Sequence, residues 1–255
     1  DITDSKTYND WRSGNLTHYL QVVKYSNVYD TDDWKMSQIS LHHSNEEINP
    51  LLDELFHSEP MDEILPNDFS NNHFLYAYYT YEENENLWNK VIRITEENSK
   101  AVEVITILDK IPGSAFSNGG VIKFGPDGKL YVGTGSVSDY SDEPQNLDSL
   151  AGKILRLNDD GTTPSDNPFE KSYVFTLGHR NPTGLAWNSQ GQMYATDSGP
   201  TKNDEINLIN AGSNYGWPEV QCFSKIVNLV NPLECFDPGL EPGGIIFYSG
   251  DKFDI

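Results

Sequence analysis

Residue types that could do chemistry gather in three polar clusters between positions 117 and 218 of the 255-residue chain. They are Ser117-Asn118-Gly119-Gly120, then Gly178-His179-Arg180-Asn181-Pro182, then Ser198-Gly199-Pro200 followed by Asp204-Glu205. A guanidinium can hold an anion, and backbone carbonyls and carboxylates are donors suited to a hard ion such as Ca²⁺. Plainer interpretations stay open: Arg180 as a salt-bridge residue, Gly199-Pro200 as a turn, Glu205 as a solvated carboxylate. His179 is expected to pack or hydrogen-bond rather than to bind a metal.

Several familiar catalytic motifs are absent. The sequence has no Gly-x-Ser-x-Gly elbow and no Cys-x-x-Cys pair. Gly133-Thr134-Gly135 lacks the third glycine and the following helix of a dinucleotide site. Asp159-Asp160-Gly161 lacks the alternating oxygen ligands of an EF-hand loop. The neighbours His42-His43 would point to opposite faces of a strand, so they are not expected to bind a metal together.

The elements that must position these clusters are short β-strands. From about residue 73 onward, β-rich runs alternate with Gly, Asn, Asp and Pro, which predicts an all-β sandwich, barrel or propeller. The predicted strands cover residues 74–81, 90–95, 101–108, 121–124, 130–133, 153–158, 173–177, 183–187, 192–196 and 205–209, with an opening strand of a further unit at 244–248. Residues 1–60 are harder to interpret: 19–24 and 36–41 alternate, and 46–56 are acidic with helical spacing.

An internal repeat favours the propeller. Residues 121–132 align with residues 184–195 at an offset of 63 positions, pairing Phe124 with Trp187, Gly128 with Gly191 and Tyr131 with Tyr194. Each copy is predicted to be a strand, a glycine-containing hairpin turn and a second strand. A weaker third copy spans 66–79. Strand-turn-strand units that recur at this spacing are typical of propeller blades.

Composition excludes some partners. The chain has 17 Lys and Arg against 39 Asp and Glu, a net charge of −22. Nucleic-acid binding needs clustered cations, and this chain has only four arginines, so we expect a solvated anionic surface and no nucleic-acid partner. Its apolar runs fall far short of the roughly 20 residues that span a bilayer. With 14 Tyr, 11 Phe and 5 Trp it can still build a core.

The cysteines and the first residues bear on location. Cys222 and Cys235 lie 13 positions apart and could close a loop in an oxidising compartment, although two free thiols at this spacing are about as common. The chain does not begin with Met and has no charged-then-apolar leader, which indicates a mature or trimmed chain. The sequon Asn15-Leu16-Thr17 arises by chance too often to decide. We expect an extracellular, periplasmic or cell-surface location.

The clusters, in this order and spacing, resemble the six-bladed propeller family of soluble quinoprotein glucose dehydrogenase and the aldose (glucose/sorbosone) dehydrogenases. The resemblance also rests on Gly125-Pro126-Asp127-Gly128, on the run 152–158, and on Asn214-Tyr215-Gly216-Trp217-Pro218. It is strong over 117–218 and fainter back to Met61 and forward to Asp251. It implies a partial propeller over 61–255 with about four blades, preceded by a divergent segment 1–60 that could form one poorly matching blade.

The family's activity is oxidation of a sugar hydroxyl at C1 by pyrroloquinoline quinone (PQQ), held with Ca²⁺. By resemblance Arg180 and Asn181 contact the cofactor, with Arg180 also counted as catalytic, and the carbonyls of Gly199 and Pro200 ligate the cofactor's calcium. Glu205 and the backbone of Tyr215 match a second, structural calcium site. These positions imply PQQ and Ca²⁺ as cofactors and a sugar or small polyol as substrate.

Two departures from the family put activity in doubt. Ser117 stands where the family has its catalytic histidine, and Ser136 replaces the aspartate that partners it. Loss of a general base costs about 10²–10⁴-fold in rate. The first hypothesis is therefore a PQQ-dependent sugar dehydrogenase with weakened or lost activity. The alternative is a non-catalytic, calcium-stabilised propeller that binds protein or glycan; a calcium-dependent propeller hydrolase is a third possibility.

Length is a further departure, because 255 residues do not provide six blades. An open propeller would expose strand edges and an apolar blade face. We therefore expect a fragment that lacks its C-terminal blades, a shrunken propeller, or closure by a partner chain, including a second copy.

Overall fold

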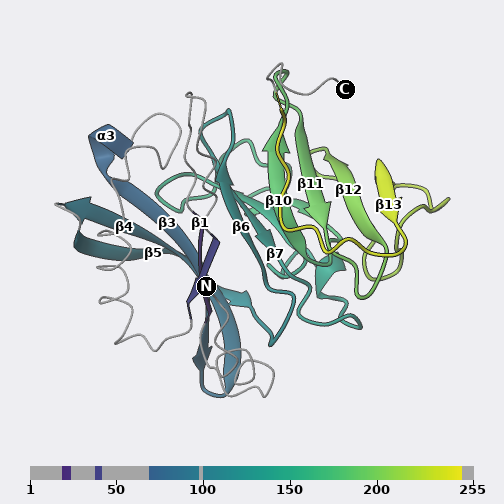
Figure 1. Cartoon of the computed structure of the whole chain (residues 1–255), viewed down its shortest axis with the longest axis horizontal. Helices are drawn as coiled ribbons and strands as arrows, with labels where there is room; N and C mark the ends of the chain where they lie inside the picture. The colour runs from purple at the N-terminus through teal and green to yellow at the C-terminus, as the bar shows by residue number, and fades with distance from the viewer. Residues whose placement is uncertain (1–18, 24–37, 42–68, 98–99, 249–255) are drawn as a thin grey trace. The chain divides into compact units, whose positions relative to one another are not determined.

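A computed structural model describes residues 19–23, 38–41, 69–97 and 100–248 (Figure 1). The chain divides into two compact units, Asp1–Ala115 and Phe116–Ile255, which are treated separately below. The expectations for residues 46–56, the His42-His43 pair and the sequon at Asn15 lie outside the described residues. The division predicted at residue 60 stays a prediction.

The first unit contains a five-stranded antiparallel sheet in the order β2-β1-β3-β4-β5. Its strands are β1 (Tyr19–Val23), β2 (Gln38–Leu41), β3 (Phe74–Glu83), β4 (Asn86–Glu97) and β5 (Lys100–Pro112). The β3–β4 hairpin turns on Asn84 and Glu85, both with positive φ, as a tight two-residue hairpin requires. Its core consists of Ala77, Tyr79, Tyr81, Ile92 and Ile94.

A one-turn helix, α3 (Phe69–Asn72), precedes β3. It lies where the third repeat copy was predicted to turn, so the strand-turn-strand prediction for 66–79 is wrong in its turn and correct in its second strand. The reason is local: the Asn72 side chain accepts a hydrogen bond from the Phe74 amide at 2.9 Å, and His73 has φ +55°. A helix end followed by a left-handed residue replaces the hairpin.

The second unit is built from two four-stranded antiparallel sheets, each with its strands in sequence order (Figure 1). The first comprises β6 (Gly119–Phe124), β7 (Leu130–Thr134), β8 (Lys153–Leu157) and β9 (Val174–Leu177), with a 3-10 turn η1 (Glu143–Gln145) before β8. The second comprises β10 (Pro182–Trp187), β11 (Met193–Asp197), β12 (Asp204–Ile209) and β13 (Glu234–Phe236). All ten strands predicted between 74 and 209 are confirmed, with ends shifted by a few residues.

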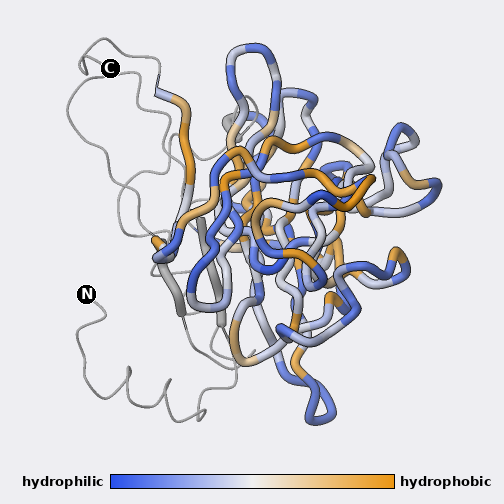
Figure 2. The backbone as a smooth tube through the Cα atoms, turned by 90° about the vertical axis from the view of Figure 1, so that its right-hand side faces the viewer, coloured by the Kyte–Doolittle hydropathy of each residue, from blue (hydrophilic) through white to orange (hydrophobic). Residues whose placement is uncertain are grey.

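The internal repeat is confirmed as a structural repeat. In one hairpin the Gly125 amide donates to the Lys129 carbonyl, and in the other the Asn188 amide donates to the Gln192 carbonyl, 63 positions on. Gly128 and Gly191 take φ +72° and +77° at the matching turn positions, where a side chain would be strained. Figure 2 shows that many of the outer loops of the chain are hydrophilic.

The two sheets of the second unit share one core. Strand β10 lies against β6 and β7. The core is formed by Val121, Tyr131, Ile154, Leu185, Met193, Ala195, Ile209 and Tyr215. First strands that pack against one another are the arrangement of neighbouring propeller blades.

The strand predicted at 244–248 is not present. Ile246 and Phe247 are 55% and 46% exposed, and no strand pairs with this segment in the described part of the chain. An apolar run forms a β-strand only where a neighbouring strand provides backbone hydrogen bonds. Among the described residues, no helix has the length and hydropathy needed to cross a membrane.

Candidate functional site

A buried histidine–aspartate pair lies at the centre of the candidate site. Nδ1 of His179 is 3.0 Å from Oδ2 of Asp197, and Nε2 is 2.8 Å from the hydroxyl of Thr176. The His179 side chain is fully buried, and its ring stacks on Tyr215 with centroids 4.7 Å apart. Both ring nitrogens are engaged, as expected for a hydrogen-bonding residue rather than a metal ligand. Because its side chain is fully buried, His179 is not accessible to a substrate hydroxyl in this structure.

Asp197 also fixes the backbone that carries the predicted cofactor contacts. Its Oδ1 accepts a hydrogen bond from the amide of Asn181 at 2.6 Å, and Oδ2 accepts one from the amide of Arg180 at 3.2 Å. Asp197 ends β11, whereas the two amides precede β10, the neighbouring strand. One carboxylate thus sets the direction in which both side chains leave the sheet.

The guanidinium of Arg180 donates hydrogen bonds to three acceptors. Nη1 donates to the carbonyls of Ser198 at 2.9 Å and Gly199 at 2.7 Å, and Nε donates to Oδ1 of Asp139 at 2.8 Å. The group lies 5.6 Å from the centroid of the Trp217 ring. Arg180 and Gly199, expected to contact the cofactor and its calcium, are therefore bonded to each other. Pro200 follows in a half-buried bend.

Asn181, which was predicted to contact the cofactor, is hydrogen-bonded through its side chain to the first sequence cluster, residues 117–120. Its Oδ1 accepts a hydrogen bond from the Gly119 amide at 2.8 Å. The backbone carbonyl of Asn181 accepts a bond from the Ser198 amide at 3.0 Å. These two bonds bring all three sequence clusters together at one end of the two sheets, although they are 62 and 17 positions apart in the chain.

Ser117 and Ser136 are brought close by their backbones but not bonded through their hydroxyls. The Ser117 carbonyl packs so closely on Gly135 that no Cβ could be accommodated there. Ser117 has φ +56°, and its hydroxyl has no hydrogen-bond partner among the described residues. Ser136 is fully buried, its amide donates to the Arg180 carbonyl at 2.8 Å, and its hydroxyl donates to the Ser138 carbonyl at 3.3 Å.

Glu205 lies in the pocket next to Arg180. The pocket is lined by Gly178, Arg180, Asp197, Ser198, Gly199, Asn203, Glu205, Tyr215, Trp217, Val220 and Gln221. Burial, and secondarily the charge of Asp197, raises the pKa of Glu205 to about 7. Hydrogen bonds from the Cys222 amide at 2.7 Å and the Asn207 amide group at 3.0 Å oppose that shift.

Tyr215 anchors the turn after β12. Its hydroxyl donates to the Leu208 carbonyl at 2.7 Å and accepts a bond from the Asn210 amide at 3.0 Å, while its own amide donates to the Leu177 carbonyl at 2.9 Å. Tyr215 and Glu205, the two positions expected at the structural calcium, line the same pocket.

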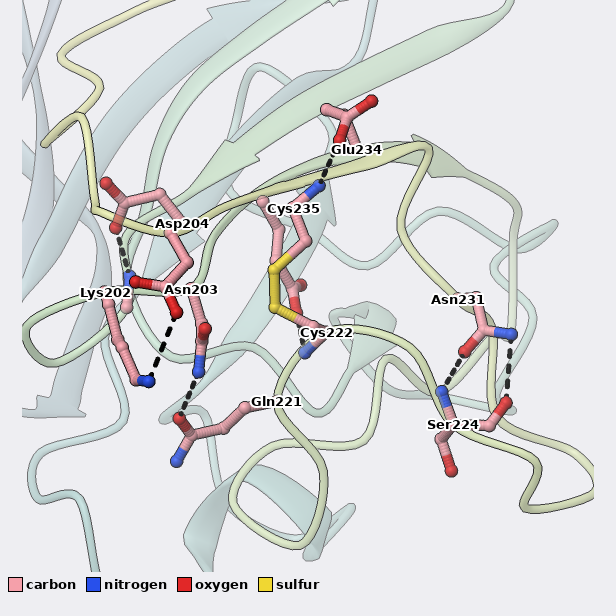
Figure 3. The surroundings of a disulfide bond; sticks show 12 residues. Lys202, Asn203, Asp204, Gln221, Cys222, Ser224, Asn231, Glu234 and Cys235 are labelled. Atoms are coloured by element: carbon pink, nitrogen blue, oxygen red, sulfur yellow. Dashed lines mark hydrogen bonds and ion pairs between the residues drawn. A yellow bond between two sulfur atoms is a disulfide. The ribbon is translucent and has the colours of Figure 1, made fainter.

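A disulfide joins two segments that border Glu205. Figure 3 shows the surroundings of this bond. Cys222 and Cys235 are bonded to each other, so the alternative of two free thiols is wrong. Cys235 pairs with Glu205 across the β12–β13 ladder, and the Cys222 amide is the donor to the Glu205 carboxylate. Nearby, Asn203 donates to Gln221 at 3.1 Å, as Figure 3 shows.

A buried lysine holds the loop that supports Gly178. Nζ of Lys153 donates to the carbonyls of Glu143, Pro144 and Ala151 at 2.8, 3.1 and 2.6 Å. The Gly178 amide in turn donates to the Pro144 carbonyl at 3.0 Å. Burial lowers the pKa of Lys153 to about 7. The three carbonyl acceptors match the three donors of an ammonium group, and a neutral amine would leave one of these carbonyls unpaired.

The donor set fits a calcium ion with an anionic cofactor better than the anion alone. Arg180 is the one Lys or Arg among the described residues that line the pocket; Asp197 and Glu205 line it too, and the guanidinium pairs with Asp139. No cluster of three or more His, Cys, Asp or Glu side chains suited to a metal is found among the described residues, so a calcium ion would depend on carbonyl oxygens such as that of Gly199. That carbonyl has a second lone pair beside its bond to Arg180.

Sequence reasoning missed four side chains that organise this site: Asp197, Asp139, Thr176 and Lys153. None belongs to a motif that names a role for it. A weak signal existed for Asp197, since it lies between the predicted strand 192–196 and the cluster Ser198-Gly199-Pro200. Its partners lie 16 to 18 positions away and are reached only through strand pairing.

Comparison with known proteins agrees with the resemblance. The chain is 34% identical over 182 residues to quinoprotein glucose dehydrogenase B of Acinetobacter calcoaceticus, covering 60% of this chain and 38% of that protein. It is 31% identical over 182 residues to the aldose sugar dehydrogenase YliI of Escherichia coli, covering 63% of this chain and 49% of that protein. The chain thus spans about half or less of the length of these relatives.

A solved structure gives the same result. The PQQ-bound form of aldose sugar dehydrogenase from Streptomyces coelicolor superimposes with a TM-score of 0.67 at 35% identity, over 72% of this chain and 55% of that one. The fold is accordingly that of a partial β-propeller. The sequence profile for Glucose / Sorbosone dehydrogenase matches residues 60–255. The chain belongs to the Glucose / Sorbosone dehydrogenase family.

Proposed function

We propose that this chain carries part of a PQQ- and Ca²⁺-dependent sugar dehydrogenase site that keeps its cofactor-holding elements and has a weak proton acceptor. The observation that supports the cofactor most directly is the Arg180 guanidinium, which is fixed beside the Ser198 and Gly199 carbonyls and over Trp217. Relatives of this family include a quinoprotein glucose dehydrogenase and a PQQ-bound aldose sugar dehydrogenase.

The residues have distinct proposed tasks. Arg180 and Asn181 hold the quinone, the Gly199 and Pro200 carbonyls hold its calcium ion, and Glu205 with the Tyr215 backbone holds a structural calcium. PQQ, when bound, accepts the hydride from C1 of an aldose or another small polyol. Because the pocket's carboxylates outnumber its one cation, calcium has to bind before or together with the anionic cofactor.

Proton removal is the step for which this chain is poorly equipped. The His179 side chain is fully buried and so is out of reach of a substrate, and the hydroxyl of Ser117 is a far weaker acceptor than an imidazole near neutral pH. The same observation favours the second candidate function, a non-catalytic calcium-stabilised propeller that binds protein or glycan. The Cys222–Cys235 disulfide supports an oxidising compartment, so we place the protein outside the cell, in the periplasm or at the cell surface.

Calorimetric titration of PQQ into the chain, in Ca²⁺ and in EDTA, tests the proposal. We expect binding near one equivalent in Ca²⁺ only, and at least tenfold weaker binding for Arg180→Gln because a charge-assisted contact is lost. Lys202→Gln is the matched control: Lys202 is 55% exposed, pairs with Asp237 and does not line the pocket. Equal binding by Arg180→Gln, or no binding by the folded chain, would contradict a quinone site.

Dye-linked sugar oxidation by the PQQ-loaded protein separates the two candidate functions. Turnover supports the dehydrogenase. Stoichiometric cofactor binding without turnover supports the non-catalytic propeller.

A further inference from the structure

The second unit has an aromatic–amide pocket, formed by Tyr131, Phe175, Trp187, Gln190, Gln192 and Asn210, that the proposed function does not use. The pocket is open to solvent, and its empty volume is about 810 Å³ when the solvent space at its mouth is counted. Its remaining lining residues are Gly191, Met193, Ile209 and Ala211. No lining residue carries a charge, although the chain as a whole has a net charge of −22.

This pocket lies at the opposite ends of the strands from the quinone site. Arg180 precedes the first residue of β10 and Trp187 is its last, while Asp197 ends β11 and Met193 begins it. At about 3.3 Å per residue, the two ends of β10 are roughly 17 Å apart. A ligand in the aromatic–amide pocket would therefore not occupy the Arg180 site.

Three of the residues that line the pocket are aromatic and contact one another. Tyr131 meets Phe175 and Trp187 edge to face, each with ring centroids 5.2 Å apart. The Tyr131 hydroxyl is tied to Oδ2 of Asp127 at 3.0 Å, which holds the ring in place. Phe175 and Trp187 are half-buried and line the pocket.

Two hydrogen-bonded turns line the sides of the pocket, the β10–β11 turn and the turn after β12. Oδ1 of Asn188 accepts bonds from the amides of Gln190 and Gln192 at 3.0 and 2.9 Å, which fixes the β10–β11 turn. Across the pocket, the Asn210 amide is bound by the Tyr215 hydroxyl at 3.0 Å. Gln190, Gln192 and Asn210 are exposed, and their side-chain amides have no protein partner among the described residues, so they can donate to and accept from a ligand.

We propose that the aromatic–amide pocket binds a neutral saccharide unit. A sugar has an apolar C–H face that packs on aromatic rings and hydroxyls that pair with amides, and it carries no charge that the pocket would have to neutralise. This second saccharide site goes beyond the proposed dehydrogenase function and does not rest on it, because it needs neither PQQ nor Ca²⁺. A saccharide bound here would attach the protein to a glycan and leave the pocket that contains Arg180 free for the proposed sugar oxidation.

The test is titration of the full chain in EDTA, without PQQ, with three neutral trisaccharides: maltotriose, cellotriose and triacetylchitotriose. Trigalacturonic acid is the charged comparison. We expect millimolar or tighter binding of at least one neutral probe, seen by calorimetry and as a change in tryptophan fluorescence, and no binding of the acidic probe. Failure of all three neutral probes to bind, or equal binding of the acidic one, overturns the proposal.

Variants locate the site. Gln190→Ala combined with Gln192→Ala should weaken binding about tenfold, since each lost hydrogen bond contributes a few-fold. Ser189→Ala, in the same turn but outside the lining, is the matched control and should bind as the unmodified chain does. Trp187→Phe, which keeps a ring against Tyr131, should lose the fluorescence change and part of the affinity. Binding that the glutamine variant leaves intact, or that PQQ with Ca²⁺ abolishes, assigns the sugar elsewhere and overturns the proposal.

Discussion

The carboxylate of Asp197 lies 3.0 Å from Nδ1 of His179, and Asp197 is only 6% exposed there. The same carboxylate accepts bonds from the amides of Arg180 and Asn181. Three donors from one short segment thus converge on a single acidic group. The geometry of the Gly178–Pro182 stretch depends on that group, because both of its oxygens act as acceptors.

Asp197→Asn should therefore be strongly destabilising despite its equal size. The amide group would place a donor against an N–H, leaving buried groups unpaired at a cost of about 2–4 kcal/mol. Urea denaturation measures this as a lowered free energy of unfolding. Asp148→Asn is the control, because Asp148 is exposed and should cost nothing measurable. Equal stability of the two variants would show that Asp197 is not the organising group.

Restoring the family's acid–base pair tests the catalytic deficit. In a version of the protein extended to the length of its relatives, Ser117→His together with Ser136→Asp should raise dye-linked sugar oxidation about 10²–10⁴-fold. Ser136 is fully buried, so Ser136→Asp alone should destabilise the fold, and Ser117→His should recover part of that loss by pairing. If the double variant binds PQQ and Ca²⁺ and stays inactive, the assignment of these two positions is wrong.

The pH dependence of stability should report on Glu205. Its pKa is raised from 4.5 to about 7, so the folded state favours the protonated carboxyl. The free energy of unfolding should then fall as the pH rises from about 4.5 to about 7, by at most about 3 kcal/mol. Glu205→Gln should remove this slope, whereas Glu219→Gln, at an exposed position, should keep it.

Calcium binding should favour the ionised form of Glu205, whereas burial favours the protonated form. An ion bound at Glu205 stabilises the ionised form, so Ca²⁺ should raise the melting temperature more at pH 8 than at pH 5. Differential scanning fluorimetry with and without Ca²⁺ at both pH values measures the difference. The effect should vanish in Glu205→Gln; a calcium effect of equal size at both pH values and in both proteins would place the ion elsewhere.

Lys153 is expected to matter for folding rather than for chemistry. Lys153→Met would leave the carbonyls of Glu143, Pro144 and Ala151 without their shared donor, at a cost of about 3 kcal/mol. Lys171→Met is a suitable control, because Lys171 is 89% exposed and its pairing with Glu170 is at the surface. Thermal denaturation should lower the melting temperature of the first variant only.

Local patterns in the sequence were sufficient for most of the fold. Ten strands and the matched hairpins follow from alternation and turn residues, because Gly128 and Gly191 sit where a hairpin needs positive φ. Strand β13 was missed, since its three residues pair with β12 and show no alternation of their own. The 244–248 strand was overpredicted because an apolar run says nothing about whether a partner strand lies beside it.

The candidate site was predictable only where motifs name it. Arg180, Asn181 and Gly199 are brought together as expected, but the direct bond from Arg180 to the Gly199 carbonyl was not foreseen. Nor was the role of Asp139, which reaches Arg180 across 41 positions. The first contact is set by the pairing of β10 with β11 and the second by how the two sheets pack, and no local pattern encodes either.

The disulfide also determines how the protein would respond to a protease. Cys222 and Cys235 close a ring of chain that includes the exposed side chains of Phe223, Ile226, Val227 and Leu233. Exposed loop residues of this kind are the preferred points of nicking. A single cut inside the ring would leave both pieces covalently joined, so the nicked protein would run as one band until a reductant is added. Because β12 and β13 would stay paired, such a nick need not disturb Glu205.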